Sequence, residues 1–135
     1  PEAMERLFTE DAVWEAEGFG RFEGRAAIRR ELADIGRDRI LWSLHFPVSP
    51  LIEVDEDHDT ATAFWWLWEL LTMSADEVAD AEPINKWLGA TYDATFRREA
   101  DAWRMSHLAL RIQKLVESAE GPNEVPVPPN RGQHT

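Results

Sequence analysis

The segment from Leu7 to Leu32 constrains the fold of this chain more than any other. It reads LFTEDAVWEAEGFGRFEGRAAIRREL, which predicts the end of a helix, a short strand, a glycine-rich turn and a second helix. Within that strand Trp14 is the large aromatic residue. A strand that carries one large aromatic side chain between two amphipathic helices favours a ligand cavity.

Length and composition predict a single globular domain. The chain has 135 residues, of which 44% are hydrophobic and 30% charged, so it can bury a sizeable core. No apolar run is long enough to span a membrane, and the start of the chain has no signal peptide, so we expect a cytoplasmic protein. The chain begins at Pro1 without Met, and we expect that upstream residues are missing.

Several functional classes are disfavoured by charge and by missing motifs. The absence of cysteine excludes a disulfide scaffold, a thiolate nucleophile and a cysteine zinc site. The net charge of -12 argues against binding nucleic acid or an anionic membrane surface. The four histidines lack the spacing of a metal cluster, and neither a dinucleotide-binding motif nor a nucleophile elbow is present. We therefore expect no metal and no cofactor.

The remaining pattern predicts two helical segments followed by an antiparallel meander. Glu2–Phe8 has the spacing of the last turns of a longer helix, and Arg25–Ile35 predicts a second helix with Gly36 at its C-cap. From Gly121 onward the chain is rich in proline and lacks periodicity, so we assign 1–115 to the domain and 116–135 to a loose tail. The predicted strands are Asp11–Ala16, a short one at Arg21 and Phe22, Ile40–Phe46, Leu51–Val54, Thr60–Thr72, Leu88–Glu99 and Trp103–Gln113, with an acidic loop over Ser74–Lys86.

Four pieces of the chain together resemble the SnoaL-like branch of the nuclear transport factor two superfamily. They are LFTEDAVWE, GRFEGRAAIRREL, LHFPVSPLIEVDEDHDTATAFWW and YDATFRREADAWRMSH, and the resemblance extends over about residues 5 to 112. It implies an α+β fold in which a curved antiparallel sheet forms a cone, closed by N-terminal helices around an apolar internal pocket. It also implies a homodimer through the sheet. This fold carries dehydratases, isomerases, cyclases, oxygenase small subunits and non-catalytic binders, so it does not fix a reaction.

Two ionisable residues stand on apolar strand faces and are the candidate catalytic pair. His45 shares a face with Leu41 and Ser43, and Glu69 is the one acid in the row of Trp65, Leu67 and Leu71. If the turn is centred on Asp57, His45 and Glu69 lie opposite each other with Cβ atoms roughly 5 Å apart. A bulge at Pro47 or Pro50 would instead shift the register by one residue.

Each member of this pair also has a structural interpretation. His45 could be a core histidine bonded to a backbone carbonyl, and Glu69 an edge or interface charge paired with an arginine. The resemblance implies a cavity histidine on the strand that contains His45 and an acid or second histidine on the next long strand. It also implies a tyrosine or aspartate from the first helix, a position to which Tyr92 does not correspond.

Aromatic and aliphatic residues on the same faces are the candidate binding residues. Phe64, Trp66 and Trp68 would face away from the pocket if Glu69 faces it, and a second subunit would cover them. His107 lies at alternate positions with Trp103 and Met105 on the last strand, where it either reaches the pocket or packs in the core or an interface. The substrate-binding residues that we expect are Trp14, Phe19, Leu41, Trp65, Leu67 and His107.

The hypothesis that unites these residues is a cofactor-independent lyase or isomerase, resembling the dehydratases of this fold. His45 would exchange a proton with a small apolar, ring-containing substrate that resembles a steroid, polyketide or aromatic compound, and Glu69 would hold the imidazole tautomer. The alternative is a non-catalytic ligand-binding or assembly subunit of the same fold. A small subunit of a ring-hydroxylating oxygenase is disfavoured by the length of the chain.

Overall fold

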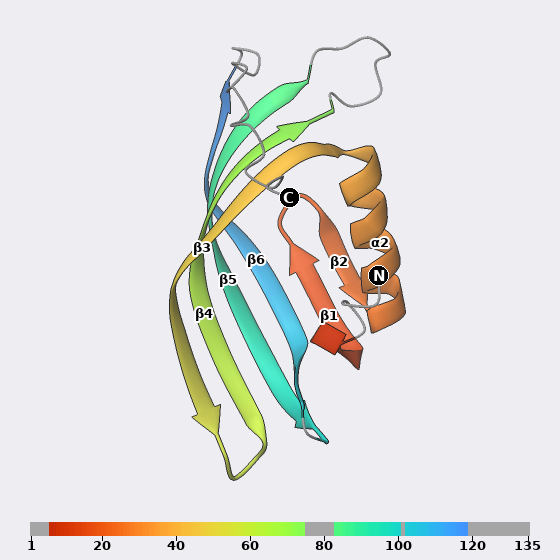
Figure 1. Ribbon diagram of the computed structural model, residues 1–135, viewed down its shortest axis with the longest axis vertical. Coiled ribbons are helices and arrows are strands. Elements are labelled where there is room, and N and C mark those ends of the chain that lie inside the picture. The colour runs from red at the N-terminus through yellow and green to blue at the C-terminus, as the bar shows by residue number, and fades with distance from the viewer. Residues whose placement is uncertain (1–5, 75–82, 101, 119–135) are drawn as a thin grey trace, which may run out of the picture.

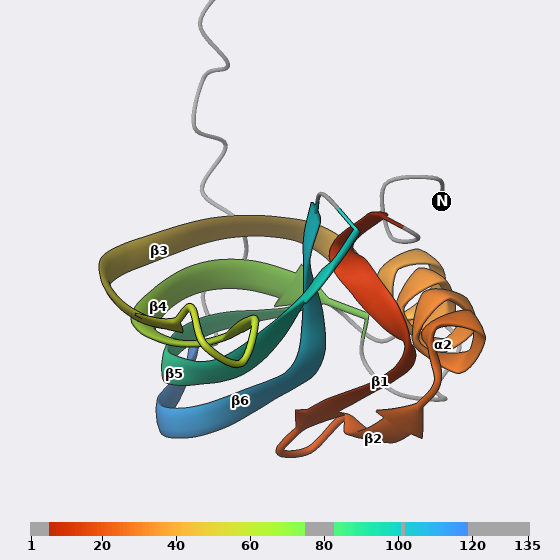
Figure 2. The same cartoon turned by 90° about the horizontal axis from the view of Figure 1, so that it is seen from below.

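Six strands form one curved sheet in the computed structural model, which describes residues 6–74, 83–100 and 102–118. The order across the sheet is β2-β1-β6-β5-β4-β3 (Figure 1). Seen from below, β3 to β6 curve together without closing into a barrel (Figure 2). The predicted α+β fold with a curved sheet is confirmed. The elements are β1 (Phe8–Ala16), β2 (Gly20–Glu23), α2 (Arg25–Asp38), β3 (Ile40–Asp55), β4 (Thr60–Met73), β5 (Ile84–Glu99) and β6 (Ala102–Ser118).

The sheet is mixed, so the prediction of a purely antiparallel sheet is wrong at one pair of strands. β1 runs parallel to β6, whereas all other neighbours are antiparallel. Short turns join β1 to β2, β3 to β4 and β5 to β6, which fixes these pairs as antiparallel. β1 and β6 come from opposite ends of the chain, and no hairpin determines their relative direction.

Several helices and strands begin or end at other residues than the sequence predicted. Only Arg6 and Leu7 of the expected first helix are helical among the described residues, because Phe8 already begins β1. The two strands predicted around the prolines form the single strand β3. The end of the expected acidic loop belongs to β5, which starts at Ile84, while residues 75–82 lie outside the described residues. β6 continues to Ser118, and the rest of the expected tail also lies outside them.

Helix α2 packs on β1, β2 and the start of β3 through the apolar face that the spacing predicts. Ile28 on this face is fully buried. Gly36 is not the C-cap: the helix continues to Asp38, and the Arg39 N–H donates to the Ile35 carbonyl at 3.0 Å. Gly36 is absent from the glycines with positive φ, so the backbone keeps its helical course there. No helix of the described part of the chain is long and apolar enough to cross a membrane.

The register between β3 and β4 places His45 directly opposite Glu69, as predicted. The prediction placed the turn centre at Asp57, but the strands pair Asp55 with Thr60, one residue out of that register. A bulge between Val48 and Leu51, where Ser49 adopts a positive φ of 53°, then inserts one residue on β3. The bulge therefore restores the predicted pairing instead of disrupting it.

The two faces of the sheet differ in burial. The inner face packs against β1 and α2 to form a cluster of buried side chains that includes Phe8, Trp14, Ile28, Leu67 and Leu71. On the opposite face Trp66 and Trp68 are 48% and 43% exposed, whereas Glu69 is buried. The predicted alternation along β4, with these tryptophans pointing away from Glu69, is confirmed.

Candidate active site

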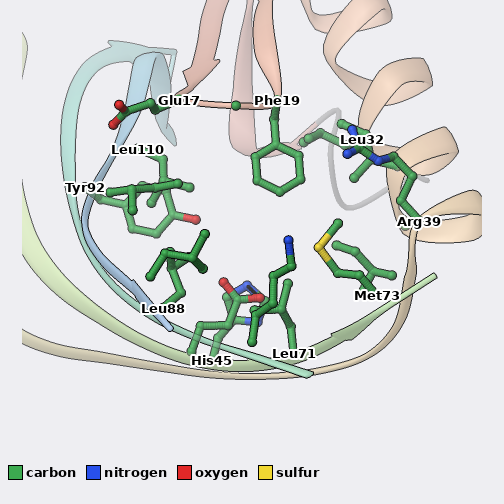
Figure 3. Close-up of a pocket in the computed structure, with 18 of the residues that line it drawn as sticks. Glu17, Phe19, Leu32, Arg39, His45, Leu71, Met73, Leu88, Tyr92 and Leu110 are labelled. Carbon is green, nitrogen blue, oxygen red and sulfur yellow. Dashed lines mark ion pairs between the residues drawn. The ribbon is translucent and has the colours of Figure 1, made fainter. Parts of the chain in front are cut away.

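A pocket of about 340 Å³ lies between α2, the β1–β2 turn and the inner face of the sheet. Figure 3 shows its lining, with Phe19 entering from the β1–β2 turn. Gly18 takes a positive φ of 79° in this turn, and the Phe19 N–H donates to the Ala16 carbonyl at 3.0 Å. This turn geometry directs Phe19 over the sheet. Most of the lining is apolar, from Trp14, Phe19, Leu32, Ile35, Ile40, Leu71, Met73, Leu88, Leu110, Ile112 and Leu115.

The imidazole of His45 lies against the carboxylate of Glu69 at the floor of this pocket. The Nε2 atom of His45 lies 3.2 Å from the Oε1 atom of Glu69, because the two residues are opposed on neighbouring strands. The side chain of Glu69 is only 7% exposed and that of His45 47%. The carboxylate is therefore buried beneath an imidazole that remains accessible from the pocket.

Burial and the neighbouring His45 act in opposite directions on the pKa of Glu69. Burial raises the pKa of Glu69, and the nearby His45 opposes this shift. A buried carboxylate needs a hydrogen-bond donor or a positive charge, and the imidazole ring of His45 supplies one. The carboxylate can consequently orient the imidazole and stabilise the positive charge that the ring gains when it accepts a proton.

Tyr92 is a polar group of the pocket that the sequence did not single out. It lies on the inner face of β5, and its hydroxyl points toward the middle of the pocket (Figure 3). Burial first, and then the Glu69 charge, raise the pKa of Tyr92 to about 12. The buried alanines at alternate positions, Ala90 and Ala94, are a sequence signal that could have revealed room for a ring.

This shift predicts how the single tyrosine of the chain ionises. Tyr92 should form phenolate near pH 12 in the folded protein and near pH 10 after unfolding. Because the unfolded chain releases the proton first, the free energy of unfolding should fall as the pH rises from about 10 to 12. Ultraviolet titration with and without denaturant measures both values, and Tyr92→Phe should abolish the phenolate signal. Equal values in the two states would contradict the buried position of the hydroxyl.

A model of the SnoaL-like domain matches residues 1–109. The chain belongs to this family. Among solved structures, a type 2 hexachlorocyclohexane dehydrochlorinase (LinA) superposes with a TM-score of 0.75 at 15% identity, over 92% of this chain and 77% of that one. A protein of Novosphingobium aromaticivorans provisionally assigned as a scytalone dehydratase gives 0.69 at 18% identity, over 86% and 72%.

A third protein, from the same organism and provisionally assigned as an aromatic ring hydroxylase, gives a TM-score of 0.66 at 19% identity over 83% and 74% of the two chains. At these identities the structural matches establish the cone-like SnoaL fold and not the reaction. No curated protein sequence matches the chain. The family predicted from the four sequence pieces is confirmed.

Four of the eight predicted site residues line the pocket of this SnoaL-like chain. These residues are His45, Glu69, Trp14 and Phe19. Trp14 also stacks on Phe22, with ring centroids 5.2 Å apart, which fixes the indole at the wall. Their catalytic and binding roles remain predictions.

Three of the other predicted residues lie outside the pocket lining for identifiable reasons. Leu41 falls at a register shift between Ile40 and Trp42, so it no longer shares a face with His45 and is exposed. Leu67 is fully packed in the core. Trp65 packs against the ring of Tyr92, with centroids 5.3 Å apart, and so supports the wall from behind.

His107 faces away from the pocket, and the pattern that suggested otherwise is broken by a bulge. Thr95 pairs with His107 and Phe96 with Met105, so Ser106 is an extra residue that reverses the alternation. The imidazole Nε2 lies 3.2 Å from the Oε1 atom of Glu15 on β1. Met105, on the other face, packs against the core.

Three charged residues of the pocket lining were also missed by sequence reasoning. Arg39, Lys86 and Glu17 contribute to its lining. They come from the end of α2, from β5 and from the β1–β2 turn, which lie far apart in sequence. No group of three or more histidine or acidic residues suited to a metal occurs among the residues that the structure describes.

Proposed function

We propose that this protein is a small-molecule lyase or isomerase that works without a cofactor by acid–base catalysis at His45. The observation that carries the proposal is the contact between His45 and Glu69, with Nε2 and Oε1 3.2 Å apart, at the floor of an apolar pocket. An apolar lining with a few convergent polar groups is the usual form of a small-molecule site. The part of the substrate that contacts this lining is accordingly an apolar ring.

In the elimination that we propose, His45 removes a proton from a carbon next to a carbonyl group. The electron pair of the broken C–H bond forms an enolate, which then forms a C=C bond as the C–O bond to the β-hydroxyl breaks. The imidazolium returns its proton to that hydroxyl, which leaves as water. Glu69 stabilises the imidazolium while it exists, as a buried carboxylate does beside other catalytic histidines.

Tyr92 supplies a hydrogen-bond donor for the oxygen that gains charge. The hydroxyl is protonated at neutral pH, as its pKa of about 12 requires, and can donate a hydrogen bond to an enolate or carbonyl oxygen in the pocket. An isomerase would use the same steps but return the proton to another carbon.

Two structural neighbours support elimination as the reaction class. One is a hexachlorocyclohexane dehydrochlorinase and the other is provisionally assigned as a scytalone dehydratase. Both names describe an elimination, of hydrogen chloride in the first and of water in the second.

Proton abstraction can be tested before the natural substrate is known. The wild-type protein, incubated in D2O with 1-tetralone or 3-hydroxycyclohexanone, should accelerate deuterium exchange at the carbon next to the carbonyl, as measured by NMR. Tryptophan fluorescence measures binding of the same ketones independently, because Trp14 lines the pocket. Binding without exchange would instead support the non-catalytic alternative.

We also propose that the protein forms a homodimer through the outer face of the sheet, the face that points away from the pocket. This proposal is compatible with either function. Trp66, Trp68 and Trp87 are exposed on this face, and the rings of Trp68 and Trp87 are in contact, with centroids 5.8 Å apart. A solvent-exposed aromatic surface of this kind is typical of an interface.

The doubly substituted Trp66→Glu/Trp68→Glu protein should therefore sediment as a monomer in analytical ultracentrifugation, while the wild type sediments as a dimer. Both side chains point away from the pocket, so ketone binding should be retained. A wild-type monomer would contradict the homodimer, and co-purification with a larger subunit would favour the assembly alternative.

A further inference from the structure

The guanidinium of Arg39 lies at the edge of the pocket. Among the described residues, no acidic side chain forms an ion pair with it. Arg39 follows α2 directly, and the Ser74 N–H donates to its carbonyl at 3.0 Å, which joins this point to the end of β4. The guanidinium lies over the ring of Phe19, 5.5 Å from the centroid. A half-buried cation stacked on an aromatic ring retains its hydrogen-bond donors for a ligand.

Lys86 supplies a second cation to the same end of the pocket. It lies on β5 opposite Leu71 of β4, which is two residues beyond Glu69 on the same strand and the same face. Its side chain is only 20% exposed, and Nζ lies 3.0 Å from the Oε1 atom of Glu117. Glu117 itself is 58% exposed and does not line the pocket, so it can turn into solvent when another anion approaches.

Among the residues that the structure describes, the acidic side chains that line the pocket do not neutralise these two cations. Glu69 is occupied by His45. The carboxylate of Glu17 points away from the middle of the pocket (Figure 3). In a chain with a net charge of -12, two cations beside an apolar pocket are a local feature and not part of a basic surface.

We infer that the substrate carries an anionic group, such as a carboxylate, which Arg39 and Lys86 bind while the ring reaches His45. The inference rests on the proposed function for the identity of the reacting end, but the anion site itself is defined by binding alone. Successive inner-face residues on one strand are roughly 7 Å apart. Lys86 and Leu71 lie one such step along the sheet from His45 and Glu69. The anionic group and the reacting carbon of the substrate should therefore be separated by about the width of one ring.

Arg39 and Lys86 are specificity-determining residues in this arrangement, because neither acts on the reacting carbon. A guanidinium binds a carboxylate through two parallel N–H donors, and the ammonium of Lys86 adds a point charge. A neutral substrate of the same shape cannot form either charged interaction, with Arg39 or with Lys86. Discrimination by charge should therefore be strong in the wild type and depend on these two side chains.

The test uses 2-naphthoate and 2-naphthamide, two probes of nearly the same shape that differ in charge, with isothermal titration calorimetry as the readout. Wild-type protein should bind the carboxylate at least about tenfold more tightly than the amide, and this preference should shrink as salt is added. Arg39→Met and Lys86→Met should each reduce the preference, and the double variant should abolish it. Arg30→Met, which removes an exposed arginine of α2, is the matched control and should leave the preference unchanged.

Glu117→Gln provides a test in the opposite direction. Removing this competitor from Lys86 should tighten naphthoate binding severalfold and leave naphthamide binding unchanged, which a structural role of Lys86 would not produce. Equal binding of the two probes by wild type, a preference that survives in the double variant, or failure of both probes to bind at millimolar concentration would each overturn the inference. A charge preference without proton exchange would refute the proposed reaction while leaving the anion site in place.

Discussion

Replacing His45 with glutamine should slow ketone deuterium exchange by about 10²–10⁴-fold, the usual contribution of a positioned general base. Glutamine preserves polarity and approximate size but cannot accept a proton at neutral pH. Because the glutamine amide can still donate a hydrogen bond to the buried carboxylate of Glu69, the free energy of unfolding should change little. Ketone binding measured by fluorescence should also persist, so the loss should appear in kcat more than in KM.

His58→Gln is the matched control for this prediction. His58 also lies beside an acid, with Nδ1 2.9 Å from the Oδ2 atom of Asp55, but this pair is exposed in the β3–β4 turn and far from the pocket lining. Exchange by the His58→Gln protein should equal that of wild type. If His45→Gln also exchanged at the wild-type rate, His45 would not be the base and the function proposed here would be wrong.

The sequence was sufficient to predict the His45–Glu69 contact because strand pairing depends on a short-range rule. A polar turn joins two alternating strands, and residues equidistant from the turn face each other. The turn centre was misplaced, and the bulge at Ser49 corrected the error. The correct pair therefore followed from two offsets of opposite sign, of which the sequence indicated only a possible bulge near Pro47 or Pro50.

Where a single extra residue shifted the strand register without a compensating error, the predicted orientation of the side chain was wrong. The extra residue at Leu41 turns that side chain out of the pocket face, and the extra residue at Ser106 does the same for His107. Bulges depend on sheet curvature and on neighbouring strands, so they leave no clear period-two signal in one sequence.

The remaining pocket residues were missed because tertiary structure brings them together. Arg39, Lys86 and Tyr92 are separated along the chain, and nothing local links them. Their convergence depends on α2 ending beside β4 and on β5 pairing with β4. Both contacts follow from the folded sheet rather than from the spacing of residues.

Glu69→Leu should raise stability and lower activity at the same time. At neutral pH we expect the free energy of unfolding to increase by about 1–2 kcal/mol, because the buried carboxylate is replaced by an apolar side chain while the remaining His45 is nearly half exposed and stays hydrated. Leucine also continues the apolar row of Leu67 and Leu71 on the inner face of β4. Proton exchange should fall by at least about tenfold, since the imidazolium of His45 would lose the carboxylate that stabilises it.

The pH dependence of the stability change identifies its cause. Burial raises the pKa of Glu69 above the value of 4.5 for an exposed glutamate, so the folded protein holds this proton more tightly than the unfolded chain. As the pH rises past 4.5 the unfolded chain ionises first, and the contribution of Glu69 to the free energy of unfolding falls. Below this pH both states are protonated and that penalty is absent. The stability gain of Glu69→Leu over wild type should consequently grow between about pH 4 and neutral pH.

Chemical denaturation of both proteins across this range measures the difference, and Glu53→Gln, an exposed acid on β3, controls for a general change in net charge. A gain that stays constant with pH would mean that Glu69 is stabilised as fully by His45 in the folded state as by water in the unfolded one. If the Glu69→Leu protein were less stable than wild type at neutral pH, the contact between Glu69 and His45 would stabilise the fold, and the buried acid would have a structural role. A gain that increases with pH, together with slower exchange, would instead mean that the fold retains a destabilising carboxylate because the histidine above it requires one.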